Sequence, residues 1–64
     1  MVHMTQASLT HEIQATRFCL TQRTTDAHRR FLQARLDWLV TYQECGAEVA
    51  GAWSEIEASL TGVQ

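Results

Sequence analysis

Residues 31–42 read FLQARLDWLVTY and hold the densest group of large apolar and aromatic side chains in this 64-residue chain. Many of these side chains recur at steps of three and four, which is the spacing of one face of an α-helix. Burying each of them stabilises a fold by roughly 1.5–3 kcal/mol. The stretch therefore predicts a helix that packs against other helices through a wide face, which is formed by Phe31, Leu32, Leu36, Trp38, Leu39 and Tyr42.

The same spacing continues on both sides of this stretch. One face can be followed from Leu20 to Leu60 in steps of three and four residues, as in the seam of packed helices. Leu9 and Ile13 begin a weaker apolar stripe upstream. No alternation typical of a strand lasts for more than four residues, and the chain has no proline. The sequence predicts an all-α fold with two or three helices.

The helix ends are predicted from local signals. Thr24, Thr25 and Asp26 form a start signal, because threonine is a favoured N-cap and an acidic residue suits the first turn. Gly46 predicts the C-terminal end of the second helix. Glycine costs about 1 kcal/mol relative to alanine inside a helix and is favoured just beyond a helix C-terminus. The first two helices could also form one rod, and Gly51 is a weak point of the third. The expected helices cover residues 6–23, 26–44 and 47–61.

The chain is short for an independent domain. A chain of ~60 residues buries only about 60% of its unfolded surface, and such chains often need a disulfide, a metal or a partner chain. One or two short helices cannot cover the whole face of residues 31–42. We therefore expect two copies, or the chain and a partner, to form a four-helix-type bundle or a coiled-coil-like dimer. The alternative is a monomeric three-helix bundle with this face as its core.

The charges are distributed unevenly. Five arginines against Glu12 and Asp26 leave +3 over residues 1–35, whereas residues 36–64 carry five acidic residues and no base, which leaves −5. Pairing between such basic and acidic regions determines which partner binds, and in which orientation, more than it increases the affinity. The alternative is that these are ordinary solvated side chains. The net charge of −2 argues against nucleic acid as the partner, since phosphate binding needs a basic excess.

No segment indicates a membrane or secretion. The longest apolar runs are far shorter than the ~20 residues that span a bilayer, and the N-terminal residues lack the pattern of a signal peptide. We expect a soluble, cytoplasmic protein with reduced thiols.

No catalytic, metal or cofactor site is predicted. Cys45 lies on the apolar seam, so it is expected to be a small buried side chain. Glu55 and Glu57 point to different sides of a helix and are unsuited to shared acid–base work. No pair of possible metal ligands has the spacing of a preformed site; they are His3, His11, His28, Cys19 and Cys45.

Residues 25–35 read TDAHRRFLQAR. This stretch resembles the histidine-x-x-phenylalanine-leucine-x-x-glutamine pattern of helical linker segments in modular polyketide synthases and related multienzymes. Phe18 and Gln22 are similar to the helix that often precedes the pattern, and the resemblance covers residues 18–42. Arg35 stands where the pattern has glutamine, and residues 46–64 match no part of it. The resemblance implies a non-catalytic docking or dimerisation element of an antibiotic-type assembly line.

The sequence thus predicts a bacterial docking domain over residues 6–62, preceded by residues 1–5 as a disordered N-terminus or an expression remnant. The expected partner is a second copy, a cognate docking helix of a neighbouring synthase subunit, or both, with no nucleic acid and no membrane. A stand-alone regulatory or adaptor protein of phage or toxin–antitoxin type is the alternative. The anchors would be the six residues of the 31–42 face. The residues expected to choose the partner are Arg29, Arg30, Arg35, Glu44 and Glu48.

Overall fold

The computed structural model describes residues 4–61 of the chain. These residues form four helices and, over this range, no strand. The helices are α1 (Gln6–Leu20), α2 (Asp26–Cys45), α3 (Ala47–Ala50) and α4 (Trp53–Thr61). The prediction of an all-α fold is confirmed. The predicted ends of the domain at residue 62 and of the N-terminal segment at residues 1–3 lie outside the described residues.

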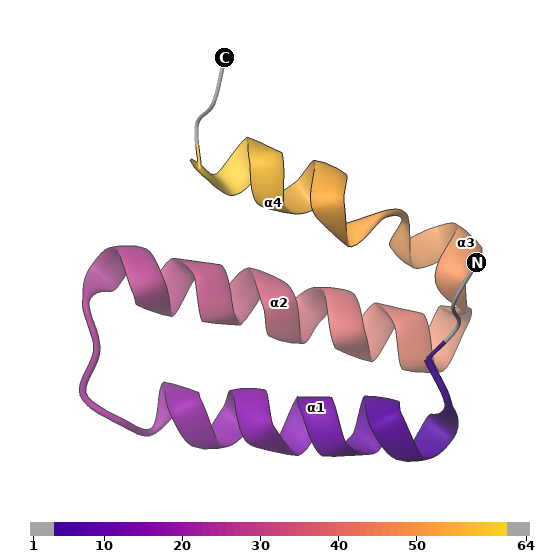
Figure 1. Ribbon diagram of the computed structural model, residues 1–64, viewed down its shortest axis with the longest axis horizontal. Helices are drawn as coiled ribbons and strands as arrows, with labels where there is room; N and C mark the ends of the chain where they lie inside the picture. The colour runs from indigo at the N-terminus through magenta and orange to yellow at the C-terminus, as the bar shows by residue number, and fades with distance from the viewer. Residues whose placement is uncertain (1–3, 62–64) are drawn as a thin grey trace.

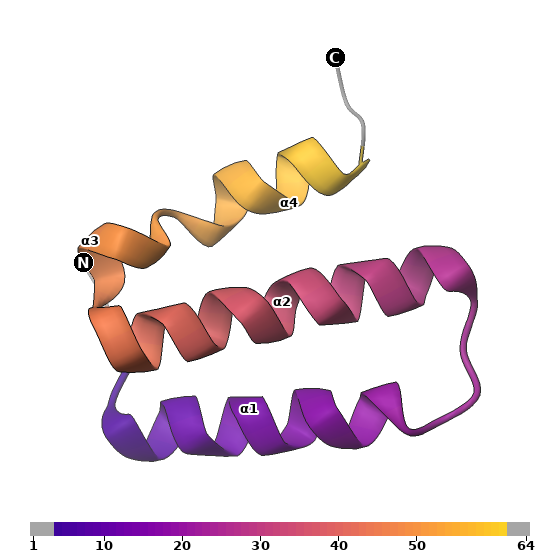
Figure 2. The same ribbon diagram turned by 180° about the vertical axis from the view of Figure 1, so that it is seen from behind.

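The three longer helices lie side by side (Figures 1 and 2). α2 is in the middle, α1 runs antiparallel along one side of it, and α4 runs antiparallel along the other side. The Cα positions extend over 30 × 30 × 17 Å. The fold is therefore a small helical bundle in the form of a single layer, in which α1 and α4 are separated by α2.

Two threonines start the long helices. The Thr5 hydroxyl accepts a hydrogen bond from the backbone N–H of Ser8 (3.1 Å), and the Thr25 hydroxyl accepts one from His28 (3.1 Å). Each bond satisfies a backbone donor that the first turn of a helix leaves free. Met4 and Thr5 are thus part of the described fold, although the sequence placed them in a disordered segment.

The Thr25 cap allows a direct test. Thr25→Ala is expected to cost about 1 kcal/mol of stability because it removes the hydroxyl that caps the start of α2. In a domain of this size such a loss lowers the melting temperature by about 4–8 °C. Thermal unfolding followed by circular dichroism measures the shift. Thr24→Ala is the matched control, and an equal shift in both variants would show that the cap is not the cause.

The first predicted helix ends earlier than expected. The N–H groups of Thr21 and Gln22 donate to the carbonyls of Phe18 and Cys19, at 3.0 and 3.1 Å. Both bonds join residues three positions apart instead of four, and they close the last turn of α1. Residues 21–25 then reverse the direction of the chain. The helix predicted over residues 6–23 therefore ends at Leu20, and α1 and α2 are two helices rather than one rod.

The third predicted helix is broken in two. Gly46 and Gly51 have φ angles of 98° and 78°, in the left-handed region that glycine adopts without steric cost. The prediction of a helix over residues 47–61 is therefore wrong at Gly51. Its first part is the short α3, and α4 begins after Ala52.

The core lies between α1 and α2. Leu9 and Ile13 of α1 pack with Leu39 of α2, whose side chain is fully buried. Thr16 is also buried, and its hydroxyl donates to the carbonyl of Glu12 (2.7 Å). None of the described side chains of α3 and α4 is fully buried.

Cys45 differs from its prediction. The sequence placed this thiol on the buried seam, but the structure shows it as an exposed free cysteine. It is the last residue of α2, and the chain turns away at Gly46 before another helix can cover it.

Candidate functional site

A row of aromatic rings runs along one side of α2. Tyr42 packs edge-on against Trp38, with ring centroids 5.4 Å apart. Trp53, the first residue of α4, lies 5.6 Å from Trp38 and 5.6 Å from Phe31. His28 stacks on Phe31 at 6.2 Å. Steps of three and four residues place the α2 members on one helix face, and we call these five residues the aromatic row.

Arg35 lies at the centre of the aromatic row. Its guanidinium carbon is 5.0 Å from the ring centroid of Trp38 and 5.0 Å from that of Trp53. Its Nη2 atom is 3.8 Å from Oε1 of Glu12 in α1. Both partners of this ion pair are partly exposed, so it adds little stability, whereas two cation–π contacts are worth about 0.5–1 kcal/mol each at such sites. Arg35 thus connects all three long helices.

Two hydrogen bonds hold the aromatic row in position. The indole N–H of Trp38 donates to the carbonyl of Gly51 (2.9 Å). The Tyr42 hydroxyl accepts a bond from the backbone N–H of Met4 (3.3 Å). The first bond holds the segment before α4 against α2, and the second holds the N-terminal segment there. The row is therefore a positioned surface and not a group of loose side chains.

The predicted anchors divide between two sides of α2. Leu39 and Leu32 are buried, and Leu36 packs against the α1–α2 core. We call the side of α2 that carries these leucines the leucine side. In this conformation no partner can reach Leu39, because α1 already covers that side. The other three predicted anchors, Phe31, Trp38 and Tyr42, belong to the aromatic row and are half-buried. Trp38 and Tyr42 also pack against the α1–α2 core from this side.

Four of the five residues predicted to choose a partner are exposed charges. Arg29 and Arg30 lie in the first turns of α2, whereas Glu44 lies in its last turn and Glu48 in α3. The Arg29 guanidinium donates to the carbonyl of Leu20 (3.0 Å). Arg35 differs from the others, because it is partly buried and contacts both α1 and α4 through Glu12 and Trp53.

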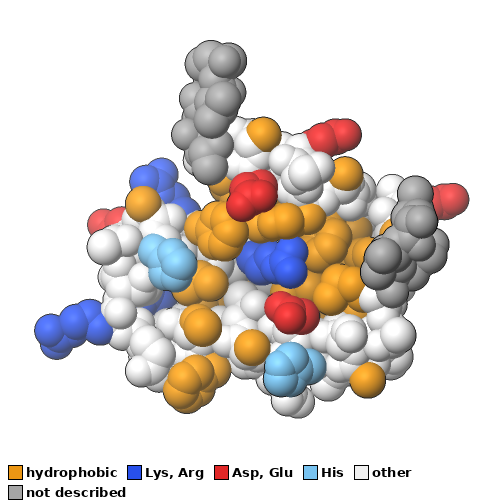
Figure 3. Space-filling model, in the orientation of Figure 1, with side chains coloured by type: hydrophobic (Ala, Val, Ile, Leu, Met, Phe, Trp, Pro, Cys, Tyr) orange, Lys and Arg blue, Asp and Glu red, His pale blue; other side chains and the backbone are white. Residues whose placement is uncertain are grey.

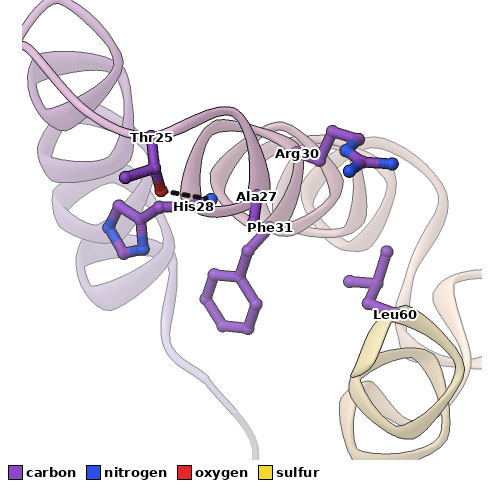
Figure 4. Close-up of a pocket in the computed structure, with 6 residues that line it drawn as sticks. All are labelled: Thr25, Ala27, His28, Arg30, Phe31 and Leu60. Atoms are coloured by element: carbon purple, nitrogen blue, oxygen red, sulfur yellow. Dashed lines mark hydrogen bonds between the residues drawn. The ribbon is translucent and has the colours of Figure 1, made fainter. Parts of the chain in front are cut away.

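An open groove adjoins the aromatic row between the start of α2 and the end of α4. Its volume is about 620 Å³. Figure 4 shows Phe31 on the α2 side and Leu60 on the α4 side. Leu60 is 42% exposed, which is high for a large apolar side chain. The groove is lined by Thr25, Ala27, His28, Arg30, Phe31 and Leu60.

Figure 3 shows this face of the molecule, where hydrophobic side chains gather across the middle with basic and acidic groups among them. Trp53 and Leu60 are part of this surface but were not among the predicted site residues. Leu60 is the last residue of the apolar seam that the sequence predicts, so its place in that seam could have identified it as a site residue. The position of Trp53 depends on the break at Gly51, which the sequence indicated only weakly.

Within residues 4–61, no three His, Cys, Asp or Glu side chains are grouped closely enough to hold a metal ion. None of the helices described has both the length and the apolar character needed to cross a membrane. Comparison with protein-family models, curated proteins and solved structures gave no match. The functional interpretation therefore depends on the surface itself.

Proposed function

We propose that this chain is a non-catalytic docking or dimerisation domain whose partner covers the aromatic row and the adjoining groove. The observation that carries the proposal is the single layer of α1, α2 and α4. Stable domains normally consist of at least two packed layers around a core. A layer with a row of half-buried rings on one face gains a second layer when another helical surface covers that face.

The overall dimensions support this proposal. The chain exposes 4848 Å², whereas monomeric proteins of 7.3 kDa expose about 4,200 Å² on average. Its radius of gyration is 12.1 Å, against about 10.7 Å for a compact domain of 64 residues. Both values are above the average for a chain of this length. A standard interface covers about 800 Å² on each partner.

The residue types in the row also support docking. Tryptophan, tyrosine and arginine are the residues most enriched among those that dominate binding energies. Here Trp38, Trp53, Tyr42 and Arg35 lie together on one face, held by contacts within the chain. A surface that is already ordered loses less conformational entropy on binding.

The resemblance of residues 18–42 suggests the setting. In a cytoplasmic polyketide assembly line, this domain would hold a carrier protein near the next catalytic domain by raising their effective concentration. The genomic neighbourhood separates this setting from that of a stand-alone adaptor. Synthase modules fused to the chain or encoded beside it support the proposal, and a phage or toxin–antitoxin neighbourhood contradicts the assembly-line part of it.

Leu60→Asp tests the docking surface. The change places a charge at the rim of the groove without altering the α1–α2 core, so the fold should remain. We expect association to weaken at least tenfold, or by about 1.4 kcal/mol, since an unpaired charge would be covered by the partner. Sedimentation across a concentration series measures this, with the chain alone and with terminal helices of neighbouring synthase subunits.

Phe18→Asp is the matched control. Phe18 is 65% exposed and lies on the opposite side of α1 from Leu9, since nine residues correspond to two and a half turns. It should leave association unchanged. If both variants bind as the wild type does, or if the wild-type chain binds neither itself nor a neighbouring subunit, the docking proposal is wrong.

A further inference from the structure

The apolar seam of the sequence is interrupted in the folded chain. From position 42 to position 60 its residues recur in steps of three and four, so they would share one face if α2, α3 and α4 formed a single helix. The chain instead turns at Gly46 and Gly51, and the seam residues near the turn lie in solvent. Val49 is 66% exposed, and Cys45 and Ala52 are also exposed.

The folded arrangement depends on the backbone of two glycines. The φ and ψ angles are 98° and 169° at Gly46 and 78° and −174° at Gly51. This region of backbone conformation is occupied essentially by glycine alone. A Cβ atom added at either position would meet no heavy atom within 4 Å apart from its neighbours along the chain. The backbone conformation therefore requires glycine at both positions, and we call residues 46–51 the hinge.

The helix after the hinge is held by few contacts. Trp53 supplies ring contacts with Phe31 and Trp38, and the indole N–H of Trp38 donates to the carbonyl of Gly51 (2.9 Å). Over residues 53–60, no side chain of α4 is fully buried. Segments with few buried apolar contacts open at a low cost in free energy, so α4 opens more readily than the α1–α2 core.

We propose that two copies of this chain exchange α4. In the exchanged dimer the hinge straightens, α2, α3 and α4 form one helix, and α4 of each copy packs on α2 of the other. Domain exchange is a low-cost route to a dimer, because the second copy offers α4 the same surface that its own chain offers. The inference goes beyond the docking function and does not depend on it, since each half of the exchanged dimer keeps the aromatic row.

The register of the contacts between α4 and α2 suits a two-fold axis near the end of α2. The two helices are antiparallel in the folded chain, as two helices across such an axis are. Trp38 and Trp53, which are in contact, lie at equal distances in the sequence from a point between positions 45 and 46. Phe31 and Leu60, on the two sides of the groove, have the same midpoint, and that of Phe31 and Trp53 is position 42. An axis at the last turn of α2 therefore reproduces the register of the folded chain.

The exchange also covers seam residues that the folded chain exposes. With the axis between positions 45 and 46, Val49 is level with Tyr42 of the second copy, and the two copies of Cys45 lie beside each other at the axis. Cys19 is far from the axis. The Arg29 guanidinium donates to the carbonyl of Leu20, which places the end of α1 beside the start of α2, about 25 Å along the helix from the axis at 1.5 Å per residue.

Two changes in the hinge test the exchange in opposite directions. Gly46→Ala with Gly51→Ala penalises the folded backbone and favours a continuous helix, so the dissociation constant of the dimer should fall at least about tenfold. Insertion of Gly-Gly-Ser-Gly between Gly51 and Ala52 lengthens the hinge and interrupts the continuous helix, so the constant should rise at least about tenfold. Sedimentation across a concentration series measures both, and circular dichroism checks that each variant keeps its helices.

A wild-type chain that stays monomeric up to about 1 mM overturns the inference. A lengthened hinge that leaves dimerisation as strong as in the wild type overturns it too, because a continuous helix through the hinge would then play no part in the dimer.

Cross-linking tests the position of the axis. Bismaleimidoethane joins two thiols that lie close together. Cys19→Ser should cross-link as the wild-type dimer does, because it keeps Cys45 at the axis, and Cys45→Ser should not cross-link. Dimers that cross-link equally well in both variants would show that the second copy is seated elsewhere, which also overturns the inference.

Leu60→Asp separates the exchange from the docking function. Leu60 lines the same groove in the folded chain and in the exchanged dimer, so this change should leave the exchange equilibrium unaltered while it weakens docking. Association that responds to Leu60→Asp and not to the hinge overturns the exchange alone. Association that responds to the hinge alone, with binding of a neighbouring subunit absent or unaffected by Leu60→Asp, overturns docking alone. A chain that binds neither partner overturns both proposals.

Discussion

Leu39→Ala is expected to lower the free energy of unfolding by about 2–5 kcal/mol, the range for truncating a buried leucine. Leu39 is fully buried, and its neighbours Leu9 and Ile13 lie in the opposing helix. The whole stability of a 64-residue domain is about 3–10 kcal/mol. The variant should therefore be largely unfolded, or close to it, at physiological temperature, and urea unfolding followed by circular dichroism measures the loss.

Leu60→Ala is the control for this prediction. It removes the same atoms from a leucine that is 42% exposed and outside the core, so its effect should stay within about 0.5 kcal/mol. A Leu39→Ala variant as stable as Leu60→Ala would show that the α1–α2 interface is not the core of the chain.

Trp53→Ala is expected to release α4 from α2 while α1 and α2 remain folded. Trp53 makes the ring contacts with Phe31 and Trp38 and one of the two cation–π contacts of Arg35. Each aromatic pair contributes about 0.5–1.5 kcal/mol and the cation–π contact about 0.5–1 kcal/mol. The loss is therefore about 1.5–4 kcal/mol, and none of the α4 side chains whose burial the structure describes is fully buried to offset it.

Amide hydrogen exchange measures this release segment by segment. Protection should be lost over α4, residues 53–61, and retained in the cores of α1 and α2. Trp53→Phe is the matched variant, because it keeps a ring at this position, and it should retain most of the protection. If Trp53→Ala leaves α4 as protected as in the wild type, then Ile56 and Leu60 hold this helix and not the ring contacts.

The two variants should also differ in what they do to the docking surface. Leu39→Ala removes the support beneath α2, so helicity and association should fall together. Trp53→Ala leaves the α2 part of the aromatic row on a folded hairpin of α1 and α2. Comparing helicity with association therefore shows whether the row is maintained by the core or by α4.

The bounds of α2 were predictable because both of its ends have local causes. Thr25 caps the N-terminus through its own hydroxyl, and Gly46 ends the helix with a positive φ angle. The predicted range of 26–44 and the observed Asp26–Cys45 differ by one residue. The end of α1 depended on bonds of Thr21 and Gln22 that no residue type marks strongly, and it was predicted three residues too late.

The candidate site was predictable in part. Phe31, Trp38 and Tyr42 stand out in the sequence by their size and spacing. Their arrangement with Trp53 could not be predicted from the sequence, because residues 15 or more positions apart meet only after the chain turns at Gly46 and Gly51. The separation of the leucine side from the aromatic side has the same origin, since both lie on one wide apolar face when α2 is considered alone.

Residue pattern and local capping were sufficient to establish an all-α chain, its central helix and an apolar face too wide for one neighbour. These properties depend on side-chain periodicity and on hydrogen bonds between residues close in the sequence. Only the tertiary structure decided which half of that face is covered: α1 covers the leucines, and α4 covers part of the aromatic row. That choice depends on the directions in which the chain leaves the turns at residues 21–25 and at Gly46 and Gly51. These directions are set by contacts between residues that are distant in the sequence.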